Sequence, residues 1–192
     1  MGLSPDRAFR IPDYAGGGYA SSLAIRFFTD VLGQHDTVSA TWSAGQNLEL
    51  GPKRRVEADF ILWYQRKMMF GNDYPTDLVF GEAKSFGKDT FKTEDVEHMK
   101  ILAERFPGSI YVFATMKPAN ELSAGEVERI SKLGLWGREF LKDKSRTRAP
   151  IVVLTGTELF TRFSLRDAWE KAGEKHAGFS SRLPSFFICR NQ

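Results

Sequence analysis

The chain has 192 residues, of which 42% are hydrophobic and 27% charged, and its formal net charge is +3. This length fits one domain with a real core, the composition excludes a disordered chain, and a single cysteine, Cys189, excludes an internal disulfide. No apolar run approaches the roughly 18 residues of a transmembrane helix, and the N-terminus lacks the apolar segment of a signal peptide. We therefore expect a cytoplasmic protein with no membrane partner.

The first fifty residues predict a lead-in, a helix and a strand. Residues 1–19 contain two prolines and three consecutive glycines, which indicates an irregular lead-in or a linker from an upstream domain. Residues 20–32 have apolar side chains at helical spacing. Residues 37–42 predict a strand, residues 43–45 a turn, and residues 47–50 an extension of that strand or a partner for it.

Two later strands carry charges where a buried strand should be apolar. Residues 56–62 read VEADFIL, and alternation puts Glu57, Asp59 and Ile61 on one face. Residues 76–85 read TDLVFGEAKS, where the same alternation puts Glu82 and Lys84 side by side at the strand end. Burying such charges is costly unless they are paired or hold a metal.

Basic residues flank the first of these strands. Lys53, Arg54 and Arg55 follow the turn at residues 51–52, and Arg66 and Lys67 begin a hairpin-like excursion over residues 65–75. Cations beside a candidate site, interleaved with aromatics, are typical of nucleic-acid contacts. A solvated surface patch and an ordinary hairpin tip are the alternatives.

The second half predicts alternating helices and strands. Thr93 is a plausible N-cap of a helix whose buried face runs to Phe106, and residues 109–115 (SIYVFAT) predict a buried central strand. A capping box opens a helix at Ser123, with Val127 on its packed side and two glycines where it could kink. The remaining elements are a strand joined by a parallel crossover and a last helix, at residues 151–155 and 164–172.

The order of these elements resembles the PD-(D/E)xK nuclease superfamily. Asp59 matches the family's first acidic residue, and Glu82 and Lys84 match its Glu-x-Lys; Asp77 does not match, because alternation sends it to the opposite face. The resemblance covers residues 56–117. It implies an α/β fold with a restriction-endonuclease-like core, in which helices flank a mixed central β-sheet, and we expect residues 20–192 to form this single domain.

The resemblance also implies a metal site. Asp59, Glu82 and the backbone carbonyl of Ala83 would bind Mg²⁺ or Mn²⁺, and Lys84 would lie beside the attacking water and the scissile phosphate. The family often takes a further polar residue from the helix that follows, and Lys92, Asp95 and His98 are the candidates for it. Three residues are candidate accessory groups: Glu57, Asp95 and His98. A solvent-facing His98 is the simpler expectation, and the first helix lacks the Glu that the family often supplies.

The sequence thus predicts a metal-dependent nuclease that hydrolyses phosphodiester bonds, with DNA as partner and a role in restriction or anti-phage defence. One alternative is a catalytically inactive nucleic-acid-binding or scaffold domain of the same fold. Another is an unrelated hydrolase or interaction domain in which Lys84 only pairs with Asp59 or Glu82. DNA versus RNA, a homodimer and an upstream domain or protein partner stay open. The sequence contains no P-loop, dinucleotide fingerprint or Gly-x-Ser-x-Gly elbow.

Overall fold

A computed structural model describes residues 18–32, 38–52, 54–66, 77–85, 88–139, 147–160, 178–180 and 186–188. Five strands form one sheet in chain order: β1 (Val38–Glu49), β2 (Arg55–Arg66), β3 (Asp77–Lys84), β4 (Ile110–Thr115) and β5 (Ile151–Leu154). The pairs β1–β2 and β2–β3 are antiparallel, whereas β3–β4 and β4–β5 are parallel. The predicted mixed sheet is confirmed, as is the predicted parallel crossover, which joins β4 to β5.

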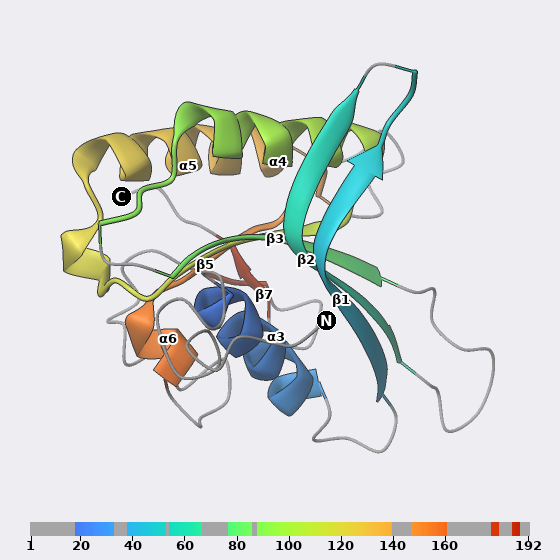
Figure 1. The fold of residues 1–192 in the computed structure, drawn as a ribbon, viewed down its shortest axis with the longest axis horizontal. Helices are drawn as coiled ribbons and strands as arrows, with labels where there is room; N and C mark the ends of the chain where they lie inside the picture. The colour runs from blue at the N-terminus through green and yellow to red at the C-terminus, as the bar shows by residue number, and fades with distance from the viewer. Residues whose placement is uncertain are drawn as a thin grey trace, which may run out of the picture.

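Helices cover both faces of the sheet (Figure 1). On one face lie α3 (Tyr19–Leu32) and the short α6 (Gly156–Phe160), and on the other lie α4 (Thr93–Arg105) and α5 (Ala124–Gly137). A 3-10 turn, η1 (Ala119–Glu121), leads from β4 to α5, and a hairpin of β6 (Gly178–Ser180) and β7 (Phe186–Ile188) lies against β5. Across the described ranges, no helix is long and apolar enough to cross a membrane.

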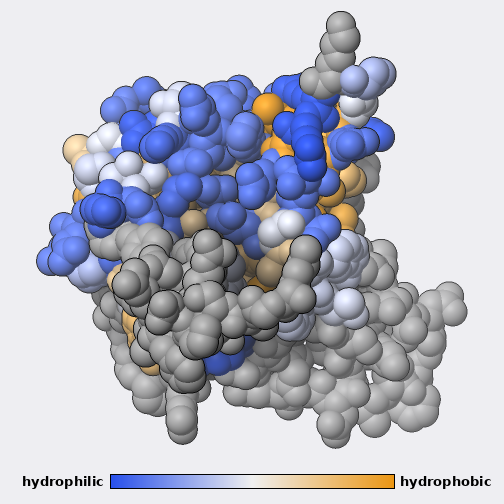
Figure 2. All heavy atoms as spheres, viewed as in Figure 1, coloured by the Kyte–Doolittle hydropathy of each residue, from blue (hydrophilic) through white to orange (hydrophobic). Residues whose placement is uncertain are grey.

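Each helical layer closes its own core. The α3 side contains Phe27, Phe60 and Val112, and the α4 side contains Phe80, Met99 and Phe113, all buried. The outer surface over α4 and α5 is mostly hydrophilic (Figure 2), as expected of amphipathic helices on a sheet. The central strand β4 is buried at every position, because helices cover both of its faces.

The turn predicted at residues 43–45 is wrong. β1 runs unbroken through these residues, and its pairing with β2 continues from Val38↔Arg66 to Glu49↔Arg55. Gly45 has a positive φ of 61° and is the one residue of β1 between Val38 and Glu49 that does not pair with β2. Glycine tolerates this backbone conformation, so the strand is distorted at Gly45 but does not end there. Residues 47–50 extend the strand, and the predicted turn at Gly51 is confirmed by its φ of 135° and by the bond from Leu50 N to Arg54 O (2.8 Å).

Alternation also fails once along β2, at Asp59. Val56 and Ala58 pack in the α4-side core, but Phe60 packs in the α3-side core although it lies two residues further along. The strand therefore rotates between Ala58 and Phe60, opposite the distortion at Gly45. Ile61 lies on the α4 side with Ala58, so the prediction that it shares a face with Glu57 is wrong.

The predictions for the helices after β3 are confirmed only in part. α4 begins at Thr93 with Lys92 as its N-cap residue, so Thr93 is the first helical residue rather than the cap. The capping box of Ser123 is confirmed, and α5 continues without a break to Gly137, although Val127 is 47% exposed instead of packed. The last predicted helix, at residues 164–172, lies outside the described residues, as does Cys189.

Candidate active site

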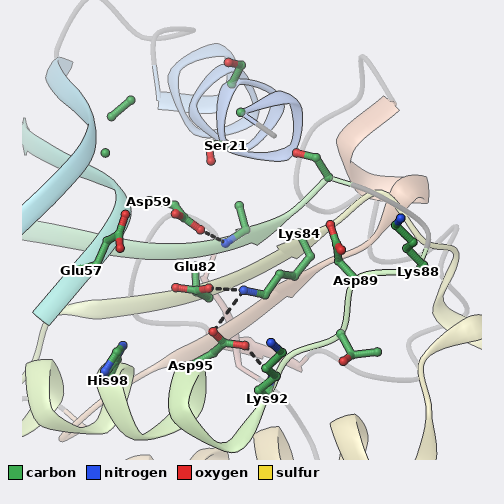
Figure 3. Close-up of a pocket in the computed structure, with 17 residues that line it drawn as sticks. Ser21, Glu57, Asp59, Glu82, Lys84, Lys88, Asp89, Lys92, Asp95 and His98 are labelled. Atoms are coloured by element: carbon green, nitrogen blue, oxygen red, sulfur yellow. Dashed lines mark hydrogen bonds and ion pairs between the residues drawn. The ribbon is translucent and has the colours of Figure 1, made fainter. Parts of the chain in front are cut away.

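A polar cavity of about 940 Å³ opens at the carboxyl end of β3 (Figure 3). Its walls come from β1 and β2, from the N-terminus of α3, from the loop before α4 and from α4 itself. The charged residues that line it are Glu57, Asp59, Glu82, Asp89, Asp95, Lys84, Lys88 and Lys92, with His98 beside them. We call this space the strand-end cavity. Elements that are far apart in sequence meet here because β2 and β3 are antiparallel, so the start of β2 lies beside the end of β3.

Asp59 lies where β2 and β3 separate. The two strands pair from Tyr64↔Asp77 to Phe60↔Gly81, which is the last pair between them. The Phe60 ring covers Gly81 so closely that a Cβ there would collide with it. Beyond that point the Ala83 amide donates to the Asp59 carboxylate (Oδ2, 2.6 Å) in place of a strand partner. The fork between the strands therefore positions the Asp59 side chain against the main chain of β3.

Lys84 joins two carboxylates from different elements. Its ammonium lies 2.6 Å from Glu82 Oε1 and 3.1 Å from Asp95 Oδ1 on α4. The predicted alternation on β3 is confirmed, because Phe80 packs on the α4 side and Glu82 and Lys84 follow it at two-residue intervals. Asp95 accepts from the Lys92 amide with its second oxygen (2.6 Å), so the start of α4 and the end of β3 are linked through one carboxylate.

Burial and mutual repulsion make this group of charges costly. Burial raises the pKa of Glu82 and the neighbouring charge of Asp59 raises it further, to about 8, although Lys84 acts in the opposite direction. Burial also raises the pKa of Asp59, despite the bond from the Ala83 amide. For Lys84, burial lowers the pKa, but Glu82 and Asp95 outweigh it, so the pKa lies above its usual value. The ammonium stays charged and does not fully neutralise the carboxylates.

The peptide of Phe91 is held from both sides just before α4. Its amide donates to Glu126 Oε1 (3.0 Å), and its carbonyl accepts from the Arg129 guanidinium (Nη2, 2.7 Å). Both partners lie on α5, where Glu126 also closes the capping box with Ser123. The first turn of α5 therefore fixes the entry of α4, and with it the position of Asp95 relative to Lys84.

The structure brings most of the predicted site residues together. Asp59, Glu82, Ala83 and Lys84 all line the strand-end cavity. The three candidate accessory residues also line it: Glu57, Asp95 and His98. Asp95 has direct contact with Lys84, whereas Glu57 is exposed, and His98 is half-buried instead of facing solvent fully.

The predicted basic contacts have a different placement. Arg54 and Arg55 are exposed at the start of β2, and neither lines the strand-end cavity. Lys53, Lys67 and the side chain of Arg66 lie outside the residues that the structure describes. No motif in the sequence indicates that Ser21 of α3 lines the cavity or that Glu126 and Arg129 of α5 bind the Phe91 peptide.

The donor set fits a divalent cation held by few protein ligands. Within the described ranges, no three or more His, Cys, Asp and Glu side chains form a group that could hold a metal. Mg²⁺, however, is commonly bound through one or two carboxylates, with waters and substrate phosphate completing its shell. Because the N–H and C=O of a strand residue point to the same edge, the Ala83 carbonyl lies on the edge where its amide meets Asp59.

The sequence matches no family model and no curated protein. Among solved structures, the chain is similar to the MspJI restriction endonuclease in complex with a 27-mer oligonucleotide. The two chains are 18% identical, with a TM-score of 0.41, and the alignment covers 83% of this chain and 31% of the other. The aligned part thus corresponds to less than a third of that protein.

Proposed function

We propose that this protein is a metal-dependent nuclease that hydrolyses phosphodiester bonds, with DNA as its substrate. The observation that carries the proposal is a pair of carboxylates, the buried Glu82 and the half-buried Asp59, beside a charged Lys84 in one open polar cavity. Burial and repulsion disfavour this arrangement in the protein alone, and a bound cation would offset both.

The residues have distinct roles in this proposal. Asp59, Glu82 and the Ala83 carbonyl would hold Mg²⁺ or Mn²⁺, ions that prefer oxygen ligands. When bound, the ion would act as a Lewis acid on the phosphate and lower the pKa of a water. Lys84 would orient that water and stabilise the negative charge that develops on the phosphate. Asp95 would be a positioning residue, because it accepts from the Lys84 ammonium and lies outside the carboxylate pair.

Cleavage assays with matched variants test the proposal. Supercoiled plasmid, linear duplex and single-stranded DNA, with an RNA of the same sequence, are incubated with Mg²⁺, Mn²⁺ or EDTA. We expect metal-dependent cleavage of DNA that falls by at least about a hundredfold in Glu82→Gln, since the variant loses a ligand charge. Glu104→Gln, an exposed position on α4 away from the cavity, is the control and should cleave like the wild type. Equal cleavage by Glu82→Gln and the wild type would contradict the assignment of Glu82.

The alternative is an inactive nucleic-acid-binding or scaffold domain. The observation in its favour is the short contact between Lys84 and Glu82 (2.6 Å), which pairs the two charges without a metal. In that case the protein would bind DNA equally well in EDTA and in Mn²⁺ and would cut none of the substrates. A role in restriction or anti-phage defence rests on the family resemblance alone. Plaque counts on cells that express the wild type or Glu82→Gln would test it.

A further inference from the structure

A buried serine on the first turn of α3 has no role in the proposed chemistry. Ser21 is only 7% exposed, yet it lines the strand-end cavity. It lies on the side of α3 that faces the strands carrying Asp59 and Lys84 (Figure 3). In the described part of the chain, its hydroxyl makes no hydrogen bond. A buried hydroxyl without a partner is costly, and a helical serine commonly bonds a carbonyl one turn back.

The main chain around Ser21 favours an anion. α3 begins at Tyr19, so Ser21 belongs to its first turn, where the amide groups have no carbonyl partner within the helix. The helix dipole adds a partial positive charge at this end. The Ala20 amide donates to Ser85 Oγ (3.0 Å), which fixes the helix end beside the residue that follows Lys84. Ser22 lines the same wall of the cavity.

The charges on the other walls show where in the cavity an anion could bind. The carboxylates of Glu57, Asp59 and Glu82 lie on β2 and β3, and Asp95 lies on α4. These walls would repel a phosphate that is not bound through a cation. The wall at the N-terminus of α3 consists of Gly18, Ser21 and Ser22, none of which carries a charged side chain. Lys88 and Lys92, before α4, and Lys84, which is paired with Glu82 and Asp95, also line the cavity and would attract an anion. The wall formed by the N-terminus of α3 differs from these because it carries no carboxylate.

We propose that the Ser21 hydroxyl and amide, at the positive N-terminal end of α3, form a binding site for a second phosphate of the nucleic-acid strand, one that is not cleaved. This inference rests on the proposed nuclease function for the identity of the ligand. The phosphate could be an internal phosphodiester or a terminal 5′-phosphate, since both present the same non-bridging oxygens. Binding there would fix the register of the strand, so that the neighbouring phosphate lies at Lys84.

The first experiment requires neither metal nor cleavage. In an Asp59→Asn/Glu82→Gln background, which removes two of the repelling charges, the full chain is titrated with inorganic phosphate in EDTA and followed by NMR of the backbone amides. Adding Ser21→Ala should weaken phosphate binding by roughly tenfold, the loss expected for one hydrogen bond to a charged group. Ser21→Thr, which keeps the hydroxyl, should restore most of it. Ser131→Ala on α5, outside the cavity, is the matched control.

The second experiment identifies the source of the phosphate. Binding of a short oligonucleotide to the wild type and to Ser21→Ala is measured in Ca²⁺, with the strand carrying either a 5′-phosphate or a 5′-hydroxyl. If the site takes a terminal phosphate, removal of the 5′-phosphate should weaken wild-type binding about tenfold and leave Ser21→Ala unchanged. If it takes an internal phosphodiester, Ser21→Ala should weaken both strands equally.

The outcomes separate this inference from the proposed function. Metal-dependent cleavage together with phosphate binding that Ser21→Ala leaves unchanged would overturn the inference and keep the nuclease. Phosphate binding that depends on Ser21, in a protein that cleaves nothing with any metal, would support the inference and reject the nuclease. Phosphate binding lost equally in Ser131→Ala and Ser21→Ala would reflect a general defect and would count against the site.

Discussion

The position of Lys84 between Glu82 and Asp95 distinguishes this site from a simple cross-strand pair. A lysine that served only to neutralise the carboxylates of the central strands would need no partner on α4. Here Asp95 accepts from the same ammonium at 3.1 Å, so Lys84 would keep one partner if Glu82 were engaged by a cation. Arginine could not replace it conservatively, because a compact ammonium and a planar guanidinium form different contacts.

Replacement of Lys84 separates catalysis from charge pairing. In Lys84→Ala we expect cleavage to fall by roughly a hundredfold or more while Mn²⁺ affinity, measured by calorimetry, persists, because Asp59, Glu82 and Ala83 remain. Lys132→Ala is the control, since Lys132 forms an exposed pair with Glu128 on the surface of α5. If Lys84 is only structural, its removal should instead cost about 3 kcal/mol of stability in a protein that neither binds Mn²⁺ nor cuts DNA.

Among the elements, the contact between α5 and the start of α4 governs the geometry of the site. The Glu126 carboxylate accepts hydrogen bonds from the Phe91 amide and from the amide and hydroxyl of Ser123. The buried Lys117 ammonium lies 3.6 Å from the same carboxylate. Burial raises the pKa of Glu126, but the bonds from Ser123 and Phe91 and the charge of Lys117 outweigh it. The pKa of Glu126 therefore lies below its usual 4.5.

The lowered pKa of Glu126 gives the stability of the fold a defined pH dependence. A carboxyl group whose pKa falls on folding stabilises the folded state fully above its ordinary pKa, and that contribution is lost as pH falls through the folded value. We expect Glu126→Gln to lower the unfolding free energy by about 3 kcal/mol at neutral pH, because Lys117 loses its buried partner. Urea unfolding at pH 7 and near pH 3 should show the difference shrink under acid.

The control for this change lies on the same helix. Glu128 is exposed and pairs only with Lys132, so Glu128→Gln should leave the urea midpoint unchanged at both pH values. A loss in Glu126→Gln that is equally large at acid and neutral pH would show that the charge of Glu126 contributes nothing. The effect would then belong to packing around Phe91.

At the scale of the whole molecule, the sheet stabilises a site that is itself unfavourable. Two cores, one on each face, hold β2 and β3 in register up to Phe60 and Gly81, and the charged residues lie just beyond that last pair. The packing of the rest of the domain therefore offsets the unfavourable free energy of removing Asp59 and Glu82 from water. A ligand that binds only the folded protein should recover part of that free energy.

Metal binding should consequently raise the melting temperature of the whole domain. At an ion concentration of about 100 times the Kd, Mn²⁺ should add roughly 2.7 kcal/mol. For a chain of this size that corresponds to an increase in Tm of about 5–10 °C over the same protein in EDTA. Asp59→Asn should lose most of this increase, and Glu104→Gln should keep all of it. An equal increase in Asp59→Asn would place the ion elsewhere.

Much of the fold could be predicted from sequence because its signals are local. The apolar run at residues 109–115, the capping box at Ser123 and the alternation along β3 each depend on neighbouring residues in the chain. These elements can therefore be predicted without knowledge of the tertiary contacts. The same applies to Asp59, Glu82 and Lys84, whose polarity interrupts hydrophobic strands and marks them before the structure is known.

The tertiary structure alone decided how these residues meet. The rotation of β2 at Asp59 arises from its place between a distorted β1 and a diverging β3, and period-two alternation cannot predict it. Alternation also cannot predict the contact between Asp95 and Lys84, which requires α4 to begin at Thr93. Nor can it predict the hydrogen bonds that Glu126 and Arg129 form with Phe91, more than thirty positions away. The sequence determined which charges lie at the strand ends. Packing between the elements determined which of them share a cavity, because side-chain distances depend on how whole elements dock.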